Sequence, residues 1–169
     1  MLKVTKEAET LKIKKELETS YKGLREYFKQ KWKDRWKQGK KGAHTRAITP
    51  CPNKSTITLH RGLRKPESAL LIQLRTGKIG FNSFLYTRKV PGVQSPNCEC
   101  NRGLMIVKHV VLQCPRWHQE REEIGQPLRT NSLKQVLSGN EGCRAAIKLV
   151  LRTKLLEQFK GAEERQRTE

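Results

Sequence analysis

Four side chains near the middle of the chain constrain its fold more than any other feature, because together they form a complete set of metal ligands. Cys98, Cys100, His109 and Cys114 follow the spacing C-x-C-x8-H-x4-C. Three thiolates and one imidazole satisfy the tetrahedral coordination of a structural zinc, and this closed set leaves no position for a reacting water. The pattern therefore predicts a structural zinc site that holds residues 98–114 together.

The residues around these ligands favour the same interpretation. Turn formers flank the first two cysteines at residues 96–97 (Pro-Asn) and 101–103 (Asn-Arg-Gly). The apolar run at residues 104–112 predicts a short buried helix that carries the histidine. Because proline cannot continue a helix, this helix is expected to end at residues 114–115 (Cys-Pro).

Two other interpretations of the same residues stay open. The cysteines are reduced and buried near a core histidine, or Cys98 or Cys114 is a nucleophile activated by His109. The spacing suits a metal better than a nucleophile. Cys51 and Cys143 are distant in sequence and are expected to be plain thiols.

The net charge limits the class of partner. The chain of 169 residues has 36 Lys and Arg against 16 Asp and Glu, which gives a formal net charge of +20. Such a field attracts polyanions, so RNA or DNA is the expected partner, with no small-molecule substrate. No apolar run approaches the roughly 18 residues of a membrane span, and cysteines without a secretory signal favour a reducing compartment. We therefore expect an intracellular protein. Its basic segments indicate the nucleus.

Residues 4–37 are expected to form one long basic amphipathic helix, because most of the apolar side chains are three or four positions apart. These are Leu11, Leu17, Tyr21, Leu24, Phe28, Trp32 and Trp36. Lys and Arg crowd the other faces of this helix and alternate with tryptophan at its end. Two interpretations compete: a solvated helix whose tryptophans pack on the core, and a helix that contacts phosphates.

The remaining patterns predict helices and no strands. Helices are expected at residues 68–76, 82–88, 116–124, 132–137 and 143–160. Pro66 and Glu67 suit the first turn of the first of these helices, and Ser132 could cap another. The predicted fold is mainly α, with a basic helical arm (1–42), a linker (43–58), a helical zinc-binding module (59–126), C-terminal helices (127–162) and a disordered tail (163–169).

Phosphate contacts are expected from basic residues on the arm and around the helix at residues 68–76. Trp36 or Trp117 could stack on unpaired bases, although Trp117 is more simply a shield for the zinc. Phosphate contacts do not identify bases, so the pattern does not distinguish RNA from DNA. The predicted nucleic-acid-binding residues are Lys31, Lys33, Arg35, Trp36, Arg61, Arg64, Arg75 and Lys78.

A further sequence pattern resembles a known family. Residues 59–65 (LHRGLRK), 68–80 (SALLIQLRTGKIG) and 81–85 (FNSFL) resemble the segment that follows the RNase H domain in fungal non-LTR (LINE-type) retrotransposon polyproteins. In that family the motif LRTGHIGLNAYL leads into a Cys-x-Cys, a His and a Cys-Pro, and the four proposed ligands and Pro115 match these one by one. The likeness covers roughly residues 25–125. It departs at Lys78 and at residues 105–106 (Met-Ile), and neither change removes a proposed ligand.

The resemblance implies a C-terminal segment of a reverse transcriptase polyprotein that helps to hold template RNA or target DNA. Polymerase and RNase H chemistry both need carboxylate clusters that hold two divalent metals. Asp34 is the single aspartate of the chain, so we expect no catalysis from the chain itself. Two rival hypotheses are a domain that binds protein partners through its long helix and a decayed retroelement fragment without present activity.

Overall fold

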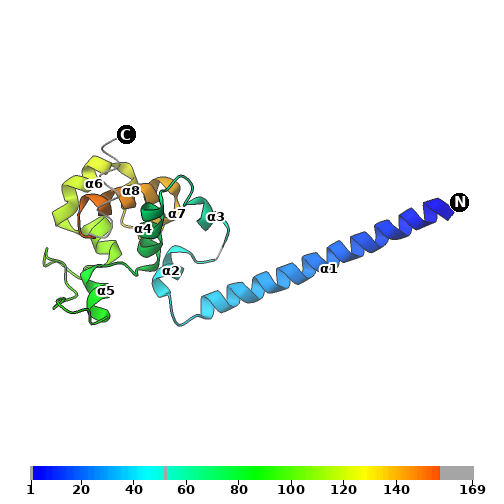
Figure 1. The fold of residues 1–169 in the computed structure, drawn as a ribbon, viewed down its shortest axis with the longest axis horizontal. Helices are drawn as coiled ribbons and strands as arrows, with labels where there is room; N and C mark the ends of the chain where they lie inside the picture. Colours follow the sequence, from blue (N-terminus) through cyan, green and yellow to red (C-terminus); the bar gives the residue numbers. More distant parts are fainter. Residues whose placement is uncertain (1, 52, 157–169) are drawn as a thin grey trace. The chain divides into compact units, whose positions relative to one another are not determined.

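The chain forms two units that are mainly helical (Figure 1). The computed structural model describes residues 2–51 and 53–156, with side chains from residue 9 onward. The units comprise Met1–Lys40 and Lys41–Glu169. The described residues contain no β-strand, only an isolated antiparallel bridge between Asn97 and Leu104. The predicted mainly α fold, with a long N-terminal helix and a small helical domain that carries the Cys₃His group, is confirmed.

The first unit is a single helix, α1 (Leu2–Gln38). Its sequence is rich in Leu, Lys, Glu and Arg, which are good helix formers, and it contains no proline. Arg35 and Lys37 lie in the last turn, where positive charge interacts favourably with the helix dipole. The predicted helix at residues 4–37 is therefore confirmed.

The second unit begins with the segment that the sequence analysis assigned to a linker, and this assignment is wrong. Residues 43–58 contain α2 (Ala43–Ile48) and α3 (Ser55–Thr58). Ile48 is buried in the core, and the Nε2 atom of His44 lies 3.0 Å from the carbonyl oxygen of Leu74. Helices this short show no apolar periodicity, so the sequence pattern resembled a loop.

The other helices of the second unit lie close to their predicted positions. The Oγ atom of Ser132 accepts a hydrogen bond from the backbone N–H group of Gln135, as expected of a helix cap. The Glu67 carboxylate accepts a hydrogen bond from the backbone N–H group of Arg64. The helices are α4 (Lys65–Thr76), α5 (Asn82–Thr87), α6 (His118–Ile124), α7 (Leu133–Ser138) and α8 (Asn140–Arg152), with shorter turns η1 (His109–Gln113), η2 (Pro115–Trp117) and η3 (Gln126–Leu128).

One hydrophobic core joins these helices. Helix α8 contacts α4, α6, α7 and η1, so the expected separation of residues 59–126 from residues 127–162 is wrong. Apolar periodicity identified the buried faces but contains no information on which faces meet. Helix α8 ends at Arg152, before the predicted end at residue 160, and residues 157–160 lie outside the described residues. The predicted tail at residues 163–169 lies outside the described residues.

Candidate metal centre and charged surfaces

A tight turn positions the first two cysteines of the metal-ligand group. The backbone N–H group of Cys98 donates to the carbonyl oxygen of Gly103 at 2.8 Å, and that of Asn101 donates to the carbonyl oxygen of Cys98 at 2.9 Å. Asn101 has a φ of 57°, a left-handed conformation that asparagine tolerates better than most residues. The turn-forming residues that the sequence analysis identified therefore bend the backbone so that Cys98 and Cys100 share one side.

The second pair of ligands comes from η1, a π-helical turn. The backbone N–H group of Cys114 donates to the carbonyl oxygen of His109 at 2.7 Å, which is the i to i+5 hydrogen bond of a π-helix. This wider turn places residues five apart nearly above one another, so the H-x4-C spacing brings both side chains to the same side. Cys114 itself is extended, with ψ of 121°, as expected of a residue before proline. The predicted buried helix and its end are confirmed.

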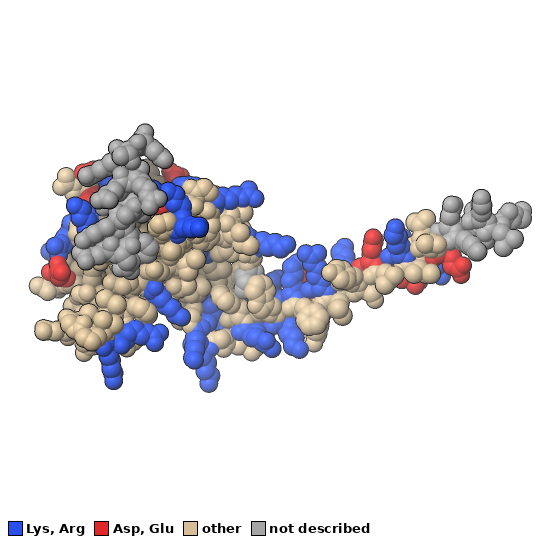
Figure 2. Space-filling view, in the orientation of Figure 1, with Lys and Arg blue, Asp and Glu red and all other residues tan. Residues whose placement is uncertain are grey.

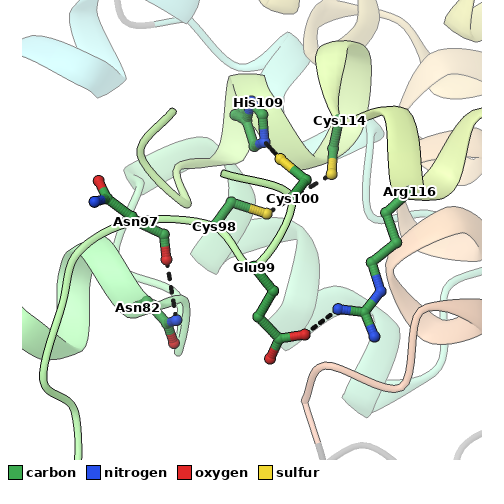
Figure 3. Close-up of polar contacts among 8 residues, drawn as sticks. All are labelled: Asn82, Asn97, Cys98, Glu99, Cys100, His109, Cys114 and Arg116. Carbon is green, nitrogen blue, oxygen red and sulfur yellow. Dashed lines mark hydrogen bonds and ion pairs between the residues drawn. The ribbon is translucent and has the colours of Figure 1, made fainter. Parts of the chain in front are cut away.

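The four ligand atoms converge, as Figure 3 shows. The sulfur atoms of Cys98 and Cys114 are 3.7 Å apart, and the sulfur atom of Cys100 is 3.1 Å from Nε2 of His109. All four atoms lie within 4.8 Å of one another. Cys98, His109 and Cys114 are buried, and Cys100 is half-buried. The arrangement could therefore hold one metal ion.

The surroundings of Cys100 and His109 favour the protonation states in which these side chains bind a metal, namely thiolate and neutral imidazole. Burial raises the pKa of Cys100, but hydrogen bonds from the backbone of Arg102 and from Cys98 and Cys114 lower this pKa overall. Burial and the charge of Arg121 lower the pKa of His109, which favours the neutral imidazole. Burial raises the pKa of Cys114 to about 12, so this sulfur needs a cation to become a thiolate.

A buried guanidinium forms a hydrogen bond to the backbone of the metal-ligand group. Arg121 of α6 is 8% exposed and donates from Nη2 to the carbonyl oxygen of Cys114 at 2.6 Å. A dication bound by three thiolates and a neutral imidazole retains one negative charge. Arg121 can offset this charge across a short distance in a poorly solvated environment. Residue spacing alone gave no sign of this contact.

Polar contacts also attach the cysteine turn to its neighbours (Figure 3). The carboxylate of Glu99 pairs with Arg116 of η2. The side-chain amide of Asn82 donates to the carbonyl oxygen of Asn97 at 3.2 Å. Trp117 packs partly buried against the core. The turn therefore links α5 to the segment that leads into α6.

The predicted nucleic-acid contacts of the arm do not share one face of α1. Lys33 and Trp36 are three positions apart and lie on one side, whereas Lys31 and Arg35 are four apart and lie on another. Residues two positions apart point in nearly opposite directions on a helix, so the alternation of basic and aromatic residues is distributed around α1. Trp36 is half-buried, and Trp32 is 53% exposed.

A row of cations shares the side of Lys33, and four of its five members were absent from the predicted set. Spacings of 3, 4, 4 and 4 positions place these residues on one face of α1. Figure 2 shows Lys and Arg concentrated over the C-terminal half of this helix. Helical periodicity of cations, rather than of apolar residues, is the signal that identifies the row. We call it the basic stripe, and its members are Lys22, Arg25, Lys29, Lys33 and Lys37.

The predicted contacts of the second unit have different environments. Arg61 and Lys78 are exposed. Arg64 is half-buried and lies 3.2 Å from the carboxylate of Glu67, which offsets its charge. Arg75 is only 8% exposed and donates to the carbonyl oxygen of Leu137 and, at 2.6 Å, to the hydroxyl of Thr49. The prediction that Arg75 contacts phosphate is therefore wrong, because its guanidinium is turned into the core.

Replacing Arg75 with methionine should therefore reduce stability and leave nucleic-acid binding unchanged. The carbonyl oxygen of Leu137 would lose its donor in a buried position, which costs about 1–3 kcal/mol. Chemical denaturation should show this loss, while the affinity of the folded variant for nucleic acid equals that of the wild type. An unchanged stability with weakened binding would restore the original assignment of Arg75.

A groove in the second unit adds three cations that the sequence analysis did not single out. Its volume is about 710 Å³, and Ile79, Phe81, Met105 and other apolar residues form much of its lining. Among the residues that the structure describes, no Asp or Glu lines this groove. Its lining also includes the basic residues Arg88, Lys108 and Lys134. These residues are far apart in sequence, so only the folded chain brings them together.

Among the described residues, none of the helices combines the length and the apolar character that crossing a bilayer demands. The candidate functional features of the described residues are the metal-ligand group, the basic stripe and the groove. Comparison with protein-family models, with curated protein sequences and with solved structures finds no match to this chain.

Proposed function

We propose that the chain is a nucleic-acid-binding module, stabilised by zinc and without catalytic activity of its own, that holds template RNA or target DNA for a retrotransposon reverse transcriptase in the nucleus. The retroelement assignment rests on the resemblance over residues 25–125. The binding activity rests on one observation above the others, the basic stripe of α1. The zinc assignment rests on the geometry of the metal-ligand group.

Two distances within the metal-ligand group are close to those expected around a zinc ion. Bonds of about 2.3 Å to sulfur and about 2.0 Å to nitrogen at tetrahedral angles separate two sulfurs by about 3.8 Å and a sulfur from a nitrogen by about 3.5 Å. The distance of 3.7 Å between Cys98 and Cys114 agrees with the first value, and the 3.1 Å between Cys100 and His109 needs only a small expansion. Thiolates with imidazole favour zinc over magnesium or calcium.

The basic stripe is a row of positive charges on one face of a helix, which suits contact with the row of phosphates of a nucleic acid. Four of its five cations are exposed, and Lys33 is half-buried. Within the described part of the chain, Lys29 is the one member with an ion pair, at 3.0 Å from Glu26. Hydrogen bonding and the charge of Lys29 lower the pKa of Glu26. Trp36 lies on the same side of the helix, where an aromatic ring can stack on an unpaired base.

The groove supports the same class of ligand. Its apolar lining suits the face of a base, and Arg88, Lys108 and Lys134 of the same lining supply cations for phosphates. The groove therefore offers a second set of contacts for a single strand. Comparison of single-stranded RNA, single-stranded DNA and duplex DNA of equal length would determine which form the module holds.

Binding should weaken steeply with salt, and the basic stripe should account for much of the slope. Each phosphate contact on duplex DNA contributes about 0.9 to the slope of log affinity against log salt. We expect the triple variant Lys22→Gln, Arg25→Gln, Lys33→Gln to lower this slope by about 3 on duplex DNA. Fluorescence anisotropy with labelled oligonucleotides at several salt concentrations measures this slope.

A triple variant of equal charge provides the control. Lys12→Gln, Lys14→Gln, Lys15→Gln removes three cations that precede the basic stripe. Its slope should fall by at most about 1, because only Lys15, seven positions before Lys22, lies on the face of the basic stripe. Equal slopes for both triple variants would reject the basic stripe as the contact surface. An affinity that does not depend on salt would reject the proposed function.

A further inference from the structure

Helix α1 carries a second row of side chains, which is apolar and exposed. Six residues follow one another every three or four positions, and each is more than half exposed. An apolar row on an otherwise charged helix normally marks a face that is covered by another element or partner. We call it the apolar stripe, and its members are Ile13 (55%), Leu17 (64%), Tyr21 (73%), Leu24 (60%), Phe28 (58%) and Trp32 (53%).

The spacings within the apolar stripe are symmetric. They are 4, 4, 3, 4 and 4 positions, a series that is the same in both directions. If a second α1 is laid antiparallel on the first, Ile13 meets Trp32, Leu17 meets Phe28, and Tyr21 meets Leu24. We infer that α1 pairs with α1 of a second copy of the chain in this antiparallel register, and that the apolar stripe is the interface.

The size of the stripe suits a dimer. Three of its six members are aromatic, and a buried aromatic side chain covers about 150–250 Å². Two paired stripes with their aliphatic members therefore remove on the order of 1,000 Å² from water, which is about the minimum for a specific interface. In the pairs Ile13–Trp32 and Leu17–Phe28, a large ring faces a smaller aliphatic side chain, as close packing of two helices requires.

The distribution of charge selects the antiparallel direction. Residues 9–20 carry three lysines and three glutamates, whereas residues 21–38 carry seven Lys and Arg against two acids. A parallel pair would place the two basic halves side by side, and like charges repel. An antiparallel pair places each basic half against a neutral half. Glu16 then lies at the level of Lys29 of the second copy.

Sedimentation of the nuclease-treated full chain at several concentrations tests the inference. We expect a dimer whose association strengthens with salt, because the paired helices have a net positive charge that salt screens. Nucleic-acid binding should respond to salt in the opposite direction, so failure of one proposal is distinguishable from failure of the other. A monomer at every concentration and salt would overturn the inference.

Substitution by lysine on opposite faces of α1 provides a matched pair. Leu24→Lys should weaken association by at least about 100-fold, because each dimer would bury two unpaired ammonium groups. Gln30→Lys adds the same charge on the face opposite the apolar stripe and should leave association within about 3-fold, since an exposed charge gains or loses little. Circular dichroism confirms that both variants remain helical. Equal effects of the two substitutions would reject the apolar stripe as the interface.

Cysteine cross-linking determines the direction and register. The variants Ile13→Cys and Trp32→Cys should form an intermolecular disulfide between positions 13 and 32 when they are mixed and oxidised with oxidised glutathione, and peptide mass spectrometry identifies this disulfide. Alone, neither should form a disulfide between identical positions, because those sites would lie about 28 Å apart at 1.5 Å per residue. Disulfides between two residues at position 13, or between two at position 32, would indicate a parallel pair and overturn the antiparallel register.

Discussion

The Cys114→Ser variant should lose its zinc and its cooperative thermal transition. A hydroxyl does not replace a thiolate in a zinc site, and three ligands do not close the coordination shell. Metal binding in small zinc modules contributes about 10–16 kcal/mol, most of which is folding free energy. Here the metal-ligand group joins the cysteine turn to η1, whose Val110 and Val111 are fully buried. Calorimetry with elemental analysis measures both effects.

Two controls separate loss of the metal from loss of a thiol. Cys51→Ser removes a cysteine outside the group and should keep one zinc per chain and the wild-type transition. Treatment of the wild type with a chelator should reproduce the behaviour of Cys114→Ser. If the Cys114→Ser variant melts as the wild type does, the cysteines are only residues of the core, and the proposed zinc site is wrong.

The Gly142→Ala variant should lose about 3 kcal/mol of unfolding free energy, although alanine is the better helix former. Gly142 lies in the first turn of α8, against α7. An added Cβ would overlap the carbonyl oxygen of Val136 and lie 2.9 Å from its carbonyl carbon. The two helix backbones must separate to admit it, which disturbs a core that contains Val136 and Leu137. Denaturant titration should show the loss, and the melting temperature should fall by on the order of 10 °C.

Gly23→Ala is the matched control, because Gly23 is also in a helix. A Cβ on Gly23 would meet nothing within 4 Å. Removing this glycine should therefore stabilise α1 by about 1 kcal/mol and raise its helix content, which circular dichroism detects. Equal responses of the two glycine variants would mean that the backbone of Val136 is not in close contact with Gly142.

Local patterns in the sequence were sufficient for the longer helices and for the metal-ligand group, but not for the short helices α2 and α3. Apolar residues three or four apart identified α1, α4 and α8. The order of Cys98, Cys100, His109 and Cys114 identified the group that converges in the structure. These inferences succeed because helical periodicity and ligand spacing are properties of neighbouring residues, which do not depend on how distant segments meet.

The role of individual charges depended instead on tertiary packing. In the sequence, Arg75 resembles a basic residue that contacts phosphate. In the structure its guanidinium is buried and donates to the carbonyl oxygen of Leu137, 62 residues away in the chain. Arg121 donates to the carbonyl oxygen of Cys114, a member of the metal-ligand group. Lys108 and Lys134 are distant in sequence but line the same groove. Sequence patterns therefore predicted the longer helices and the four residues that could hold a metal ion. The packed structure determined which charges face solvent, because exposure depends on contacts between segments that are far apart in sequence.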